Sequence, residues 1–399
     1  MRSIKEIFVV GHGPSSSHTM GPAFACEYII KKYPTLKHVD VTLYGSLALT
    51  GKGHLTDYII DLKLKNLSHN IIFDCKTATK HPNTMIFAVE LEDGSKAEET
   101  VISIGGGTIL TGEGVESASK DVYPEHNLKE MMQYCIDKNI SLMDYVLEKE
   151  GNDILPYLRN VYDVMMKARE RGIAASGELP GSLHVKRKAK IMYENMISEG
   201  EISNINMNVA ITSFAVAEEN AGGGVISIAP TCGSAGVLPG CITYLHLKGY
   251  QKEEIVRGML VAGLIGIIAK TNASVSGAEC GCQAEIGVAC AMSAAMVGAV
   301  KGYDNEDIAQ AAEIAMEHSL GLTCDPVEGY VQIPCIERCA IFALKAINAA
   351  SLALIIPFSG TKVSFDDSLK TMYQTGKDLK KGYRETSTSG LAKMLKDKE

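Results

Sequence analysis

The sequence lacks the features that would assign the protein to a membrane or to an export route. Its longest nearly uncharged run, Ile286 to Val300, is shorter than the roughly 18 apolar residues that a membrane-spanning helix needs, so we interpret it as a buried helix. Residues Met1 to Val10 have mixed charge and only a short apolar run, which is unlike a secretory signal. We therefore expect a cytoplasmic protein with no membrane partner.

Clusters of basic residues are also missing. The 39 Lys and Arg residues are scattered and are outnumbered by 47 Asp and Glu residues, which gives a formal net charge of −8. A protein that holds a phosphate backbone needs a basic patch, so we expect no nucleic-acid partner. No internal repeat is visible, and 399 residues are enough for two domains.

The pattern of the first part of the chain indicates a small sheet with one early helix. Short β-rich runs separated by Gly and Asp-Gly extend from Lys37 to Gly107, and Pro22 to Lys32 has helical character. Asp93-Gly94 predicts a hairpin turn. We expect an α/β-type N-terminal domain over residues 1–115.

The rest of the chain is typical of a helical domain, so the fold class expected for the whole protein is α+β. Residues 116–126 are polar, contain a proline and predict a linker, and residues 127–399 form the expected helical domain. The charged C-terminal end is expected to be solvated over about its last ten residues. Helical spacing of apolar residues is clearest at Ile154–Arg171, Met207–Ala221, Ile255–Lys270, Ile286–Val300, Asp304–His318 and Ile336–Ile356.

Cysteine needs an explanation, because eleven cysteines in a chain without an export signal are better explained by thiols, metal ligation or catalysis than by disulfides. Cys282 lies in NASVSGAECGCQAEIG, and Cys324 and Cys335 lie on either side of a loop that contains Pro and Gly. Their spacing matches neither a ferredoxin run nor a paired zinc motif. From spacing alone, cluster ligation and buried free thiols both remain open.

Two polar segments in the N-terminal half could carry chemistry. GHGPSSSHTMGP places hydroxyls before a helix, which suits either an anion site or an ordinary helix cap. TGKGHLTD places Lys52 and His54 in a glycine-flanked turn that is not a Walker A loop. A histidine in such a turn can act as a general base or can simply be solvated.

Together these segments resemble the iron-sulfur L-serine dehydratase family in its fused, single-chain form, over nearly the whole chain. The matching stretches, in order, are GPSSSHTMGP, LYGSLALTGKGH, HPNTM, AEENAGGG, APTCGSAGVLPG, NASVSGAECGCQAEIG, GLTCDPVEGYVQIPCIER and TGKDLKKGYRETS.

The resemblance implies an ammonia-lyase that converts L-serine to pyruvate and ammonia on a [4Fe-4S] cluster with one open iron. It implies a homodimer with a small-molecule substrate. The implied cluster ligands are Cys282, Cys324 and Cys335, and the implied catalytic residues are His54 as the base, His18 and Lys52. The implied substrate-binding residues are Ser15, Ser16, Ser17, Thr19, Asn272, Ser274 and Ser276.

Cys280 and Cys339 differ from the residues frequent in relatives, and Cys232 occupies a variable place in its segment, so we interpret all three as non-ligands. Alternative functions are the same chemistry on L-cysteine or L-threonine, or a redox-sensing iron-sulfur protein without turnover. A pyridoxal-phosphate enzyme is disfavoured, because no lysine lies in a recognisable Schiff-base context.

Overall fold

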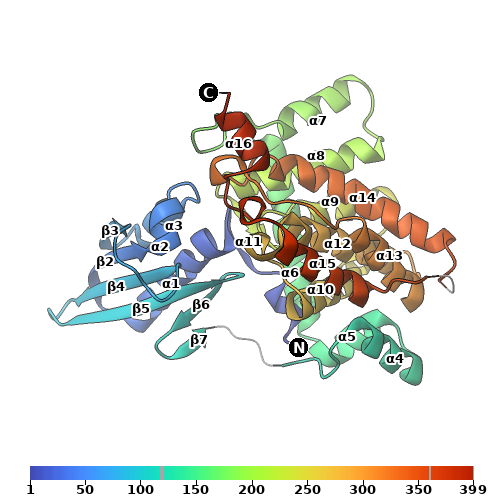
Figure 1. Cartoon of the computed structure of the whole chain (residues 1–399), viewed down its shortest axis with the longest axis horizontal. Coiled ribbons are helices and arrows are strands. Elements are labelled where there is room, and N and C mark those ends of the chain that lie inside the picture. Colours follow the sequence, from blue (N-terminus) through green and yellow to red (C-terminus); the bar gives the residue numbers. More distant parts are fainter. Residues whose placement is uncertain (117–120, 359–360, 399) are drawn as a thin grey trace. The chain divides into compact units, whose positions relative to one another are not determined.

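The computed structural model describes residues 1–116, 121–358 and 361–398, and the chain divides into two compact units. The sheet unit is Gly11–Ala118, and the helical unit combines Met1–Val10 with Ser119–Glu399. Figure 1 shows the sheet unit in blue to cyan and most of the helical unit in green to red. The α+β fold class predicted from the sequence is confirmed. The predicted linker includes residues 117–120, which lie outside the described residues.

The sheet unit contains six strands in the order β3-β2-β4-β5-β6-β7, of which only β2 and β3 run parallel. Alternate residues of β2, namely Val39, Val41 and Leu43, are buried against the helices, as the two-residue period of a strand requires. The predicted hairpin is confirmed, because β4 and β5 pair across Asp93-Gly94. The elements are η2 (Ser16–Met20), α1 (Gly21–Lys32), β2 (Leu36–Tyr44), α2 (Gly45–Thr50), α3 (Thr56–Leu64), β3 (Ser68–Asp74), β4 (Thr84–Leu91), β5 (Lys96–Gly105), β6 (Thr108–Thr111) and β7 (Gly114–Glu116), and β1 (Val10–His12) begins at the last residue of the N-terminal segment.

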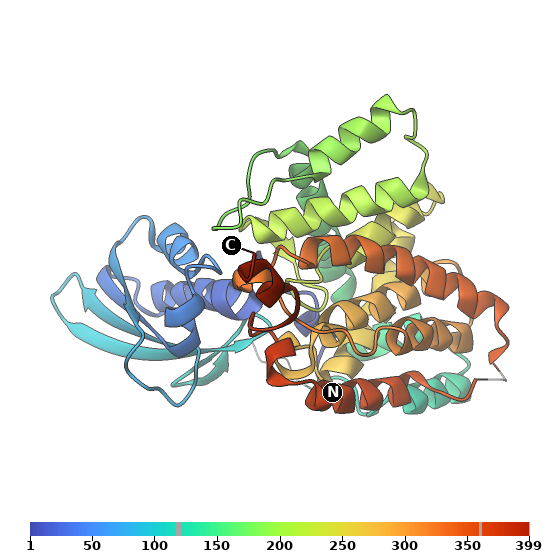
Figure 2. The ribbon, with the colours of Figure 1, turned by 45° about the horizontal axis from the view of Figure 1, so that its top comes forward.

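The helical unit is built around α10 and α12, whose residues are buried on nearly every side. Both helices are apolar all round, which is what a helix enclosed by other helices requires. Figure 2 shows α14 running along α8 on one side of this core. The elements are η1 (Ile4–Glu6), α4 (Leu128–Lys138), α5 (Leu142–Glu150), α6 (Ile154–Ala174), α7 (Ala189–Ser198), α8 (Ile205–Ala221), β8 (Val225–Ser227), α9 (Val237–Leu247), α10 (Lys252–Asn272), α11 (Gly277–Cys280), η3 (Gln283–Gly287), α12 (Val288–Val300), α13 (Asn305–Glu317), η4 (Val327–Gly329), α14 (Cys335–Ile355), α15 (Phe365–Asp378), η6 (Lys381–Tyr383) and α16 (Gly390–Lys396).

The first ten residues differ from the sequence-based boundary, which placed them in the N-terminal domain. Ile4 and Ile7 are fully buried in the core of the helical unit. Their side chains lie so close to Gly263 and Gly266 of α10 that a Cβ at either glycine would approach them to 2.7 Å. The segment therefore belongs to the helical unit because its apolar side chains pack there.

Two helices are long and apolar enough to cross a membrane by length and composition alone. One is Gln283–Val300, in which a π-helical turn extends the predicted apolar run to 18 residues, and 89% of it is buried. The other is Cys335–Ile355, of which 44% is buried. A core helix satisfies the same criterion, and the prediction that Ile286–Val300 is a buried helix is confirmed.

The close crossing of α6 and α8 gives a first testable expectation. Gly172 lies against the backbone of Ala215, and a Cβ at residue 172 would come within 2.2 Å of the Ala215 carbonyl oxygen. Gly172→Ala is therefore expected to lower the free energy of unfolding by about 1–3 kcal/mol, because the two helices must separate. Urea denaturation followed by circular dichroism measures this change. Gly112→Ala, whose Cβ would meet no atom within 4 Å, is the control, and equal midpoints for the two variants would contradict the packing argument.

Candidate metal centre and histidine pair

A group of possible metal ligands forms in the helical unit where α11 ends. The Sγ atoms of Cys282 and Cys324 and a carboxylate oxygen of Glu285 all lie within 4.8 Å of one another. Cys282 and Glu285 are one turn apart at η3, so the π turn directs both toward the same point. Gly281 precedes them with a φ of +73°, a conformation that favours glycine and lets the chain reverse before Cys282.

Cys324 is held from the C-terminal part of the chain. Its N–H donates to the carbonyl of Tyr383 (2.9 Å), and its own carbonyl accepts from the N–H of Glu385 (2.7 Å). Gly277 leaves room on the other side, because a Cβ there would lie 3.1 Å from the Cys324 sulfur and 2.5 Å from Glu285 Oε2. The position of Cys324 therefore depends on segments that are distant in the sequence.

The prediction that the last ten or so residues are solvated is wrong in part. Gly390–Lys396 form the helix α16, and the N–H of Leu391 donates to Asp325 Oδ2 at 2.7 Å. Asp325 follows Cys324 directly, so α16 is anchored to the loop that carries this cysteine. The polar composition of the C-terminal segment did not predict that the buried carboxylate of Asp325 binds the first turn of α16.

The thiols of Cys282 and Cys324 have different electrostatic environments, which shift their pKa values in opposite directions. A hydrogen bond from the Cys324 thiol, assisted by the guanidinium of Arg338, lowers the pKa of Cys282 to about 7 in spite of burial. The same hydrogen bond, with burial, holds the pKa of Cys324 well above its usual value. Burial and the charge of Cys282 raise the pKa of Glu285 to about 8. Near neutral pH one thiolate is thus available as a metal ligand.

Cys335 is the third cysteine predicted to bind metal, and it stands at the first position of α14. It does not belong to the group of atoms within 4.8 Å. It is near enough that the charges of Cys282 and Glu285, after burial, raise its pKa well above the usual value. The structure therefore gathers Cys282 and Cys324 with a carboxylate, and the charges of that group act on Cys335.

The cysteines predicted to be non-ligands include two near this group. The Cys339 thiol donates to the carbonyl of Gly233 (3.3 Å), and burial raises its pKa to about 12. Burial and Glu285 hold the pKa of Cys232 above its usual value. Cys280 packs against Gly376 of α15.

The predicted substrate-binding residues of the NASVSG turn are largely engaged in hydrogen bonds within the protein. The Asn272 amide donates to the carbonyl of His126 at 2.7 Å. Ser274 donates to Glu279 Oε2 at 2.8 Å and accepts from the N–H of Ser276 at 3.0 Å. These bonds shape the turn that leads into α11 and Cys282.

In the sheet unit, two predicted catalytic residues lie side by side. The ring centroids of His18 and His54 are 4.7 Å apart. His18 Nδ1 is 2.9 Å from Ser17 Oγ, and its Nε2 is 2.9 Å from Ser46 Oγ. The Thr19 hydroxyl donates to the carbonyl of His54 at 2.7 Å, which ties the two loops together.

Both imidazoles are predominantly neutral near pH 7. Burial, followed by the neighbouring His54, lowers the pKa of His18 to about 3, and burial lowers the pKa of His54. His54 Nδ1 lies 3.1 Å from the carbonyl of Thr50, which can only accept, so Nδ1 carries the proton. Nε2 of His54 then carries no proton, and its lone pair can accept one, as a general base requires.

The remaining predicted residues of this unit have other positions. The ammonium of Lys52 lies 5.4 Å from the ring centroid of Phe73. Ser15 is the N-cap of η2, where its Oγ accepts from the N–H of His18 (3.1 Å) and its own N–H donates to Thr19 Oγ1 (3.2 Å). Ser16 opens the π turn. Ser15 therefore caps the helical turn that precedes α1.

Comparisons with known proteins match two families along the chain, with boundaries that differ from those of the two units. Residues 3–68 match the serine dehydratase beta chain family, and residues 89–392 match the serine dehydratase alpha chain family. L-serine dehydratase TdcG of Escherichia coli is 38% identical over 450 aligned positions, which cover 98% of this chain and 99% of that protein. The L-serine dehydratase of Helicobacter pylori strain 26695 is 38% identical, with 99% of each chain covered, and that of Mycobacterium bovis is 37% identical, with 98% and 97% covered.

The chain belongs to the serine dehydratase family. It is therefore a lyase that joins the alpha-chain and beta-chain regions in one polypeptide.

Sequence reasoning missed three residues of this serine dehydratase that surround the thiols. Glu285 lies among the possible metal ligands, and Arg338 donates to the carbonyl of Thr323 at 2.9 Å while its charge favours the Cys282 thiolate. Glu385 reaches the same region through its backbone bond to Cys324, and burial and Glu285 raise its pKa to about 8. One available signal was spacing, since Glu285 follows Cys282 by three positions and Arg338 follows Cys335 by three, which is about one helical turn.

Proposed function

We propose that this chain deaminates L-serine to pyruvate and ammonia and that it holds a [4Fe-4S] cluster on Cys282, Cys324 and Cys335. The observation that carries the proposal is the convergence of the Cys282 and Cys324 sulfurs beside Arg338. Cluster binding needs thiolates, and the depressed pKa of Cys282 favours one. The relatives from E. coli, H. pylori and M. bovis are all named L-serine dehydratases.

The residues present fit such a cluster. The sulfurs of Cys282 and Cys324 already lie within 4.8 Å of each other, and the charge of Cys282 contributes to the raised pKa of Cys335. Gly277 leaves open the space beside Cys324 that a side chain would fill. When bound, a cluster with one open iron supplies a Lewis acid for the substrate hydroxyl.

The chain's own residues supply the proton chemistry and the binding of the substrate. His54 Nε2 removes the α-proton, because this nitrogen is unprotonated and its ring is oriented by the Thr50 carbonyl. Loss of that proton and of the β-hydroxyl gives water and an enamine, which hydrolyses to pyruvate and ammonia. The loop Ser15–Thr19 orients His18 beside His54 and offers serine hydroxyls as donors for the substrate carboxylate.

The test is purification without oxygen, followed by iron and sulfide counting and an assay of pyruvate from L-serine. Rates on L-threonine and L-cysteine, measured side by side, decide the substrate. L-serine turnover that depends on bound iron is the expected result. Turnover that persists fully after iron is removed would overturn the proposal.

The pH dependence of turnover provides a second test. Burial lowers the pKa of His54 below its ordinary value of 6.5, so most of the imidazole is neutral at pH 6.5. We expect kcat/KM to fall toward acid pH with a midpoint below pH 6.5, as His54 becomes protonated. A pH profile of kcat/KM on the iron-loaded enzyme measures this limb. A fall that begins well above pH 6.5 would show that a different group is the base.

A further inference from the structure

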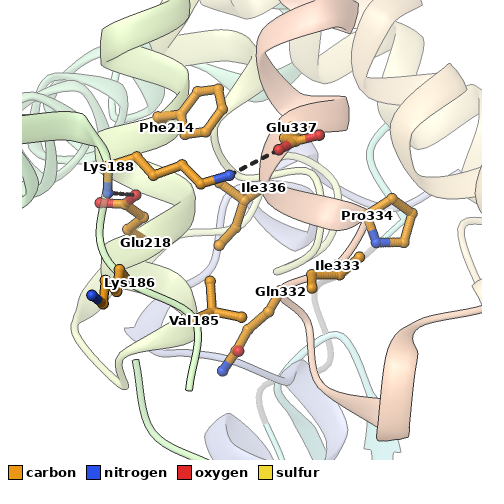
Figure 3. Close-up of a pocket in the computed structure, with 10 residues that line it drawn as sticks. All are labelled: Val185, Lys186, Lys188, Phe214, Glu218, Gln332, Ile333, Pro334, Ile336 and Glu337. Carbon is orange, nitrogen blue, oxygen red and sulfur yellow. Dashed lines mark hydrogen bonds and ion pairs between the residues drawn. The ribbon is translucent and has the colours of Figure 1, made fainter. Parts of the chain in front are cut away.

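A second candidate binding site lies in the helical unit, at the N-terminal end of α14. It is a cavity of about 130 Å³. Its walls come from the loop before α7, from α8 and from the segment that flanks Cys335 (Figure 3). The lining residues are Val185, Lys186, Lys188, Phe214, Glu218, Gln332, Ile333, Pro334, Ile336 and Glu337.

Hydrogen bonds hold the walls of this cavity in place. The N–H of Leu179 donates to the Val185 carbonyl at 2.8 Å, so the loop before α7 is part of a short hairpin. The amide of Gln332 donates to the carbonyl of Pro180 at 2.7 Å and ties the segment before Cys335 to that hairpin. A site with walls fixed in this way is preformed, as small-molecule sites usually are.

The charged side chains that line the cavity indicate which kind of ligand it can bind. The carboxylate of Glu218 accepts from the N–H groups of Lys188 (2.6 Å) and Ala189 (3.3 Å), so it is already occupied. The ammonium of Lys188 lies 3.0 Å from Glu337 Oε1, and Figure 3 shows this ion pair spanning the cavity. Both side chains are more than half exposed (52% and 66%), so the pair is weak and a ligand can open it readily.

Apolar side chains complete the cavity beside this ion pair. Phe214 and Val185 are half-buried, and Ile336 is only 5% exposed. Lys186 comes from the same loop as Lys188, but Figure 3 shows its nitrogen pointing away from the ion pair. The cavity thus offers a cation, an anion and an apolar wall within a small volume.

We propose that this cavity binds a short apolar α-amino acid, such as L-valine. Its carboxylate takes the place of Glu337 on Lys188, and its ammonium takes the place of Lys188 on Glu337. Its side chain packs on Phe214 and Ile336. Each half of the ion pair keeps a partner, and the ligand adds apolar burial that the pair by itself does not have.

Binding here also acts on the proposed metal centre, an inference that rests on the proposed role of Cys335. Ile333, Pro334, Ile336 and Glu337 line the cavity and flank Cys335 on both sides. A ligand that restrains this segment restrains the cysteine as well. Because coupling between two sites is reciprocal, we expect the affinity for L-valine to differ between iron-loaded and iron-free protein.

The absence of tryptophan from the sequence provides a clean test. Phe214→Trp gives a full-length chain with one tryptophan, located in the cavity wall. We expect its fluorescence to change saturably with L-valine, and isovalerate and isobutylamine, which each lack one charge, to bind at least about tenfold more weakly. Tyr58→Trp, at a residue of the sheet unit that is 50% exposed, is the control and should not respond.

Because the tryptophan of Phe214→Trp could itself block the cavity, binding of L-valine is also measured by calorimetry on the unsubstituted chain. Saturable binding of L-valine that weakens about tenfold in Lys188→Ala supports the proposal. No binding of L-valine by either method, or isovalerate binding as tightly as L-valine, would overturn it. Equal affinity for L-valine in iron-loaded and iron-free protein would contradict the expected coupling between the cavity and the metal centre. The binding assay needs no serine turnover, so its failure is distinct from a failure of the proposed function.

Discussion

Replacing Cys335 with serine is expected to lower serine deamination by on the order of 10³-fold and to reduce the iron content of the protein. The reason is that the proposed cluster has three protein ligands, and an alkoxide from serine is a much poorer ligand for iron than a thiolate. Cys335 is the informative position, because the structure gathers Cys282 and Cys324 within 4.8 Å but leaves Cys335 outside that group. Iron and sulfide counts on protein prepared without oxygen, together with a pyruvate assay, measure both effects.

Two comparison variants make this experiment decisive. Cys339→Ala removes a buried thiol one helical turn further along α14 and should retain its iron, because Cys339 already donates to the Gly233 carbonyl. Glu285→Gln removes the carboxylate that lies among the thiols, and the proposed ligand set predicts that it retains its iron too. If Glu285→Gln loses iron while Cys335→Ser keeps it, the third ligand is the carboxylate and the assignment of Cys335 is wrong.

Replacing His54 with glutamine is expected to lower kcat by about 10²-fold or more while the iron content stays unchanged. Glutamine keeps much of the shape of the side chain but cannot accept the α-proton. His54 suits the base role, because burial keeps its ring neutral and the Thr50 carbonyl holds the proton on Nδ1, which leaves Nε2 unprotonated. Turnover of L-serine and the iron content are measured on the same sample.

The matched control for this variant is His69→Gln. His69 lies on β3 of the same unit, and its Nε2 is 2.9 Å from a carboxylate oxygen of Asp61, which is 63% exposed. A surface pair of this kind contributes little to stability, so turnover should be close to that of the unsubstituted enzyme. Near-normal turnover in His54→Gln would remove His54 from the base role.

The sequence by itself determined many of the helices of this protein, one hairpin and its family. Apolar residues predicted α6, α8, α10, α12, α13 and α14 to within a few residues at each end. Helices such as α6 and α13 bury one face, which imposes the helical period, whereas α10 and α12 are apolar on nearly every side. Asp93-Gly94 predicted its hairpin from local backbone preference alone. Motif order predicted the serine dehydratase family, which the comparisons show.

Only the tertiary structure decided where the distant segments meet. Met1–Val10 joined the helical unit because Ile4 and Ile7 fit against glycines of α10, and no local pattern encodes that fit. The bonds between Cys324 and the stretch that carries Glu385 likewise join residues about sixty positions apart, as does the contact of α16 with Asp325. Local periodicity fixes which face of an element is apolar, whereas the choice of partner depends on shape and hydrogen bonding across the whole fold. Spacing alone could have indicated Glu285 and Arg338, but Glu385 became visible only when the chain was folded.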